Sequence, residues 1–178
     1  VLVLGFAVLL LPRKYVTLPM FAIACFIPTA QRIVVMGAAF DLLRILILFG
    51  WVRLVVRNEF REFTWNRIDM LMLAWMISGT VIFTLNYGTF SAFVNRCGWM
   101  FDGLGMYFLF RSILQEWEDF DRLVKCVILI SIPVAAAFAI ERLTGRNAFS
   151  IFGGVPAITN IREGNLRCQG AYSHPILA

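Results

Sequence analysis

Four arginines and the only histidine of the chain lie close together near the end of the sequence. The arginines are Arg142, Arg146, Arg162 and Arg167, and the histidine is His174. A guanidinium can hold a phosphate with two parallel hydrogen bonds, and an imidazole can exchange a proton near neutral pH. These residue types predict a phosphate or diphosphate site. Two simpler interpretations remain open, since loop arginines also bind lipid headgroups and a histidine before a proline is often only a surface residue.

The backbone around His174 fits an anion site as well. Gly170 would allow another group to approach the backbone closely. Pro175 suits the first turn of a helix, with Ser173 as a cap. The free N–H groups at a helix start favour an anion. We therefore expect residues 175–178 to begin a further helix, with the anion at its entry.

The composition indicates the environment in which this site lies. The chain has 178 residues, of which 60% are hydrophobic, and its mean hydropathy is +0.79. A soluble domain of this length is usually nearer half apolar. The sequence therefore predicts an all-α integral membrane protein, a polytopic bundle of transmembrane helices. The net charge of +5 does not indicate nucleic acid, because the basic residues sit in short clusters between apolar runs. The four cysteines lack metal-ligand spacing, so no metal site is expected.

Apolar runs define about five to six spans, with a truncated one at each end. The runs cover residues 1–11, 15–28, 33–56, 68–87, 92–111 and 123–141. A crossing needs about 20 residues as helix, so the run 15–28 is a thin span, a re-entrant segment or half of a broken helix. We expect a helix bundle over 1–141 and an extracytoplasmic loop over 142–174. Both ends look like partial spans, which predicts a longer protein.

Basic residues set the expected orientation. Half of the 16 Lys and Arg residues cluster in 12–14, 57–67 and 111–125. If all six runs cross, these segments share one side, and the positive-inside rule makes it cytoplasmic. The segment 142–173 then lies outside. Arginines are not favoured on that side by the positive-inside rule, so another cause is needed for them, such as binding of an anion. Residues 115–125 are amphipathic and suit either an interfacial helix or a solvated linker.

Three charged residues, Asp41, Arg44 and Asp102, fall inside apolar runs. Each costs about 2.5–3.5 kcal/mol on insertion scales. Asp41 and Arg44 share a helix face, and Asp102 has a similar depth. We expect Arg44 to bond one of the two carboxylates. The charges either fix helix packing or form a polar cavity floor, and a transporter or channel with an intramembrane Asp/Arg pathway is the alternative function.

The motif Arg-x-x-Gly-x-Tyr-x-His-Pro at Arg167, Gly170, Tyr172, His174 and Pro175 resembles the O-antigen ligase and polymerase family. The resemblance implies a multi-pass, metal-independent glycosyltransferase of the GT-C type in the bacterial inner membrane. It implies transfer of a polyprenyl-diphosphate-linked glycan to an acceptor glycan or lipid on the periplasmic side, in cell-envelope polysaccharide synthesis, with no cofactor and no nucleic acid.

The resemblance also implies residue roles. Arg146, Arg162 and Arg167 would bind the diphosphate, with Arg167 and His174 catalytic. The chain departs from the family at Ile176, where many members have Asn, and it lacks the large outer loop that carries further Arg and His. The resemblance therefore covers the N-terminal half of such an enzyme, and a fragment of this extent would be inactive alone.

Overall fold

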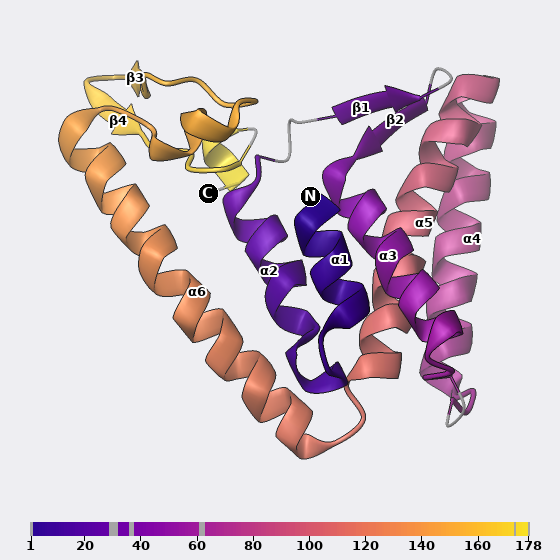
Figure 1. Ribbon diagram of the computed structural model, residues 1–178. Coiled ribbons are helices and arrows are strands. Elements are labelled where there is room, and N and C mark those ends of the chain that lie inside the picture. Colours follow the sequence, from indigo (N-terminus) through magenta and orange to yellow (C-terminus); the bar gives the residue numbers. More distant parts are fainter. Residues whose placement is uncertain (1, 29–31, 36–37, 61–62, 173, 178) are drawn as a thin grey trace. The chain divides into compact units, whose positions relative to one another are not determined.

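The chain is mainly α-helical, as the composition predicts (Figure 1). The computed structural model describes residues 2–28, 32–35, 38–60, 63–172 and 174–177. They form two compact units: Val1–Leu46 with Glu116–Ala178, and Ile47–Gln115. Among the described residues, two helices are long and apolar enough to cross a membrane by length and composition, α4 (Arg67–Tyr87) and α6 (Trp117–Thr144).

The first unit begins with two short helices. α1 (Leu2–Leu10) leads through the 3₁₀ turn η1 (Arg13–Tyr15) into α2 (Thr17–Phe26), and α2 packs against both α1 and α6. Ten helical residues rise about 15 Å, which is half of a hydrocarbon core of about 30 Å. The run 15–28 therefore contains a helix that by itself covers only half of a membrane.

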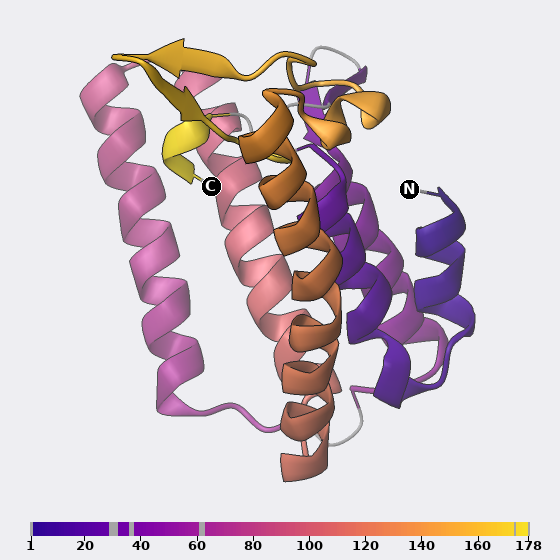
Figure 2. The same cartoon turned by 90° about the vertical axis from the view of Figure 1, so that its left-hand side faces the viewer.

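α6 is the longest helix, with 28 residues and a length of about 42 Å. A capping box between Glu116 and Asp119 starts it, and Gly145, at a φ of 67°, ends it. The amphipathic residues predicted as a separate interfacial helix or a linker are instead the first turns of α6. α6 begins at Trp117, and its ribbon continues into the apolar part without a break (Figure 2).

The apolar run 33–56 differs from the prediction. Its helix α3 (Leu42–Val56) begins only at Leu42, and β1 (Arg32–Val35) pairs antiparallel with β2 (Ala38–Asp41). β-branched side chains favour extended backbone, and 33–35 holds three of them in succession. The expectation of an all-α fold is correct for most of the chain but wrong for this segment.

The second unit is built on a helical hairpin. α4 and α5 (Phe90–Ile113) lie side by side in both views (Figures 1 and 2). Gly88, at a φ of 62°, ends α4, and the Thr89 hydroxyl accepts from the Ala92 N–H at 3.2 Å. A positive φ favours glycine, so these residues make the tight connection between the two helices.

A buried carboxylate closes the other end of this hairpin. Asp69 is fully buried and forms a capping box with Asn66. Its Oδ1 accepts from the Tyr107 hydroxyl at 2.8 Å and pairs with Arg111. Arg111 also donates from Nη2 to the Thr64 carbonyl at 2.6 Å. The polar residues before α4 and the last turns of α5 therefore lie at one end of this unit.

Candidate functional site

Glu141, in the last turn of α6, anchors what we call the closing segment, residues 142–177. The residue is 1% exposed. Its carboxylate accepts from the Thr159 hydroxyl at 2.9 Å, the Gln169 N–H at 3.1 Å and the Gly170 N–H at 2.9 Å. Hydrogen bonds to an ionised acceptor are among the strongest in proteins. One side chain thus ties two separate parts of the closing segment to the end of α6.

Asn147 makes a second set of bonds from the same region. Its Nδ2 donates to the Gly170 carbonyl at 2.8 Å, and its Oδ1 accepts from the Phe149 N–H at 2.9 Å. Its own N–H donates to the Ala157 carbonyl at 3.0 Å. The side chain is almost fully buried, so the closing segment is internally bonded and not an open loop.

Gly170 is hydrogen-bonded to both Glu141 and Asn147, and it has no room for a side chain. Its φ is +56°, in the left-handed region, and a Cβ there would lie 2.5 Å from Cζ of Phe138. Glycine is the residue that adopts this backbone without strain. The glycine of the motif therefore allows the close approach expected from the sequence, and the group that it approaches is an α6 ring.

The two arginines nearest the motif lie on a short hairpin. β3 (Asn160–Arg162) pairs antiparallel with β4 (Asn165–Arg167), with Asn160 opposite Arg167 and Arg162 opposite Asn165. Glu163 and Gly164 make the turn at φ values of 55° and 77°, as two-residue hairpin turns require.

Directly paired residues of such a hairpin share a face, and alternate residues of a strand do too. Arg162 and Arg167 therefore lie on one face with the two asparagines. Leu166 lies on the other face, next to Gly145. Arg162 is exposed and forms an ion pair with Glu163 at 3.5 Å, which contributes little to stability because both side chains are exposed. Arg167 is partly buried.

Arg146 and His174 lie outside the β3–β4 hairpin. Arg146 forms an isolated bridge with Ile158 and has an exposed side chain. The exposed His174 accepts at Nδ1 from the Ile176 N–H at 3.2 Å, at the start of η3 (Pro175–Leu177). This bond assigns the proton of the neutral ring to Nε2. In the described part of the chain, no hydrogen bond or ion pair joins His174 to Arg146, and the proposed cap Ser173 lies outside it.

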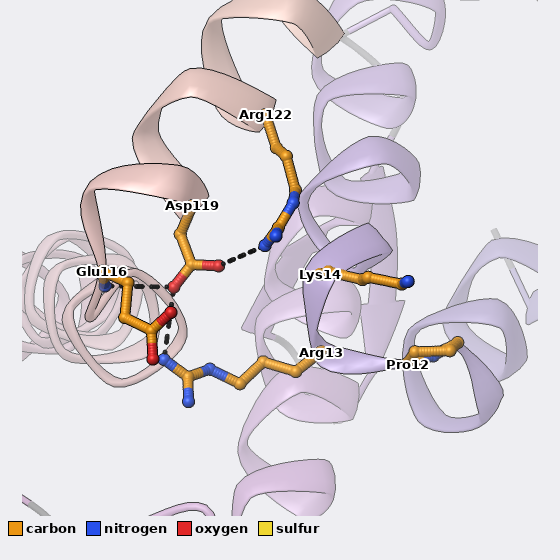
Figure 3. A pocket seen from close by; sticks show the side chains of 6 residues that line it. All are labelled: Pro12, Arg13, Lys14, Glu116, Asp119 and Arg122. Atoms are coloured by element: carbon orange, nitrogen blue, oxygen red, sulfur yellow. Dashed lines mark hydrogen bonds and ion pairs between the residues drawn. The ribbon is translucent and has the colours of Figure 1, made fainter.

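The opposite end of the first unit holds an ion-pair cluster (Figure 3). It borders an open pocket of about 280 Å³, lined by Pro12, Arg13, Lys14, Glu116, Asp119 and Arg122. Asp119 accepts from Arg13 at 3.3 Å and from Arg122 at 3.0 Å. The Lys14 ammonium points away from both carboxylates in Figure 3. Because Asp119 already has two cationic partners, the cluster holds the chain together at this end and is a weaker ligand site than the closing segment.

The predicted intramembrane pair stays a prediction. Arg44 is partly buried in the first unit and Asp102 is partly buried in the second. The side chain of Asp41 lies outside the described residues. The second unit instead contains an ion pair that the sequence reasoning missed, between Arg53, 1% exposed, and Glu59, which bond twice at 2.7 and 3.0 Å.

No family model, curated protein or solved structure matches the chain. The site must therefore be assessed on its own geometry.

Sequence reasoning also missed Glu141, although one signal was available: an acidic residue in the last turn of an apolar helix, where the helix dipole favours a cation. An acidic residue at this position requires a stabilising interaction, and three hydrogen-bond donors provide it here.

Proposed function

We propose that this chain is part of a membrane glycosyltransferase of the O-antigen ligase type. It transfers or polymerises a polyprenyl-diphosphate-linked glycan on the outer face of a bacterial inner membrane. The observation that carries the proposal is the β3–β4 register, which gives Arg162 and Arg167 a common face. β4 then leads directly into Gly170 and His174, and Glu141 holds that part of the chain in place.

The chemistry suits these residue types. A lipid diphosphate is already a good leaving group, so the enzyme must mainly neutralise its growing charge. Two guanidiniums on one face can do this without a metal. Asn160 and Asn165 on the same face can donate further hydrogen bonds, and His174 can donate from Nε2. The base that deprotonates the acceptor hydroxyl is assigned to residues outside the closing segment.

The outer-face placement of the closing segment rests on α6. Arg13 pairs with Asp119 near its first turn, and Phe149 packs on Phe138 near its other end. From Asp119 to Phe138 the helix rises about 29 Å, close to the thickness of a hydrocarbon core. Arg13, Lys14, Arg122 and Lys125 lie at the first end, and the four arginines of the closing segment lie at the other. The proposed diphosphate accounts for the second group, so the positive-inside rule is applied to the first end and makes it cytoplasmic. The closing segment then lies outside.

A transfer assay tests the proposed activity. The intact protein is placed in lipid vesicles with a fluorescent glycan on polyprenyl diphosphate and with an acceptor glycan. We expect the glycan to move to the acceptor and free polyprenyl diphosphate to appear, unaffected by EDTA. If the donor stays intact while labelled glycan or ions cross the vesicle wall, the chain is a transporter and the proposal is wrong.

Cysteine labelling tests the sidedness. In a background without native cysteines, Asn160→Cys should react with an impermeant maleimide added to intact cells from outside. Thr64→Cys, in the exposed polar segment before α4, is the matched control and should react only after permeabilisation. Both positions are exposed, so access alone separates them. The reverse pattern would place the closing segment in the cytoplasm, where the donor diphosphate is not presented.

A further inference from the structure

Arg96, in the first third of α5, holds its guanidinium against aromatic rings. Its Nε is buried and makes no hydrogen bond within the described part of the chain. Its Cζ instead lies 4.2 Å from the ring centroid of Phe83 and 5.6 Å from that of Trp99. Such cation–π contacts hold the guanidinium against the ring faces. The N–H groups on its two Nη atoms lie in the guanidinium plane, so an acceptor at that edge can reach them without leaving the ring contacts.

Arg96 is the charged wall of a groove between α4 and α5. The groove measures about 240 Å³ and is lined by Trp75, Met76, Gly79, Thr80, Arg96, Trp99 and Met100. The Thr80 hydroxyl already donates to the Met76 carbonyl at 2.8 Å. A Cβ at Gly79 would meet nothing within 4 Å, so the groove is open there. One guanidinium therefore stands at a wall that is otherwise almost entirely apolar.

We propose that this groove binds an anionic phospholipid, with its phosphate on Arg96 and an acyl chain along the tryptophans. The reason is charge complementarity: the apolar walls suit a hydrocarbon chain, and a guanidinium suits a phosphate. Trp75 and Trp99 are 65% and 63% exposed, so their rings offer a large apolar surface. A free phosphate would leave that surface uncovered.

The depth of Arg96 agrees with this occupant. The helix rises about 9 Å from Phe90, at the tight turn, to Arg96. An arginine at such a depth in a bilayer extends toward the headgroups and seeks an anionic acceptor. The inference goes beyond the proposed function. It depends on the α4–α5 hairpin lying in a membrane and not on glycan transfer.

Lipid binding tests the inference directly. The intact protein is delipidated in detergent, and tryptophan fluorescence is followed during titration with phosphatidylglycerol that carries bromine on its acyl chains. Bromine quenches nearby indoles, so bound lipid should quench Trp75 and Trp99 in a saturable way. Arg96→Gln should weaken this binding about tenfold or more, and Arg96→Lys should also weaken it, because an ammonium lacks the two-pronged fork.

Arg67→Gln is the matched control, since Arg67 is an exposed arginine at the far end of α4. It should bind brominated lipid like the unchanged protein, with equal helix content by circular dichroism. Three results would overturn the proposal: equal affinity for brominated phosphatidylcholine, displacement of the lipid by inorganic phosphate, or unchanged binding by Arg96→Gln. Preferential binding of polyprenyl diphosphate would also overturn it, by assigning the groove to the glycan donor. No donor glycan is present in the titration, so failure of the transfer assay leaves this test intact.

Discussion

Replacement of Glu141 with alanine is expected to release the closing segment from the end of α6 while α6 itself stays helical. The change removes the acceptor of three hydrogen bonds, which come from the Thr159 hydroxyl and from the Gln169 and Gly170 amides. Each unsatisfied buried donor costs about 1–3 kcal/mol. A loss of about 3 kcal/mol or more corresponds to an opening equilibrium at least about a hundredfold more favourable. Trypsin added outside sealed vesicles should therefore cleave at Arg162 and Arg167 about a hundredfold faster.

Glu141→Gln separates the charge from the shape. The amide keeps the volume of the carboxylate but turns one acceptor oxygen into a donor. That donor must face either Gly170 or the Thr159 and Gln169 pair, so at least one bond is lost and cleavage should still accelerate by about tenfold.

Glu163→Gln is the matched control, because Glu163 lies exposed in the hairpin turn and surface changes usually stay within about 0.5 kcal/mol. Equal cleavage of all these variants and the unchanged protein would contradict the anchoring role of Glu141.

The sequence predicts the long helices well because a long apolar helix and its apolar run have nearly the same extent. The run 68–87 corresponds to α4 (Arg67–Tyr87), and the run 92–111 corresponds to α5 (Phe90–Ile113). α6 extends beyond its run of 123–141 at both ends. Hydropathy marks only the apolar part of a helix, whereas its caps are polar residues and glycine.

Interior polar contacts are harder to predict because their partners come together only in the folded chain. Arg53, Asp69 and Glu141 are all buried. The capping box of Asp69 with Asn66 can be recognised in the sequence, since it is local. The bond from Tyr107 to Asp69 joins residues on two helices, and no local spacing indicates it.

The candidate site also has one part that can be predicted from local sequence and one part that depends on the folded chain. The motif residues could be recognised in the sequence, but the common face of Arg162 and Arg167 depends on the register of β3 and β4. Gly164 suits such a turn, but Glu163 is not among the residues that two-residue hairpin turns prefer, so the hairpin has only a weak signal in the sequence. A one-residue slip would have moved one arginine to the other face, so composition alone could not show that the two lie together.

Arg167→Ala in the intact protein is expected to lower the rate of glycan transfer about a hundredfold or more. Removal of one donor to a transition-state anion typically costs about 3–4 kcal/mol. Arg167→Lys should also impair transfer, since an ammonium keeps the charge but cannot make two parallel bonds to a phosphate. His174→Ala should cost less, because its proposed role is a single hydrogen bond from Nε2 and the principal base lies elsewhere.

Kinetics and a matched control separate this role from a structural one. Loss of a contact made only in the transition state lowers kcat, whereas loss of ground-state binding raises KM with kcat unchanged. We expect Arg167→Ala to lower kcat chiefly. Ile161→Ala changes the opposite face of the same hairpin, where Ile161 is 70% exposed, and should transfer glycan normally. Each variant is first shown to insert in the membrane and to resist outside trypsin like the unchanged protein. Wild-type transfer by a correctly inserted Arg167→Ala protein would remove Arg167 from the catalytic machinery, and the glycosyltransferase proposal would lose the residue on which it chiefly rests.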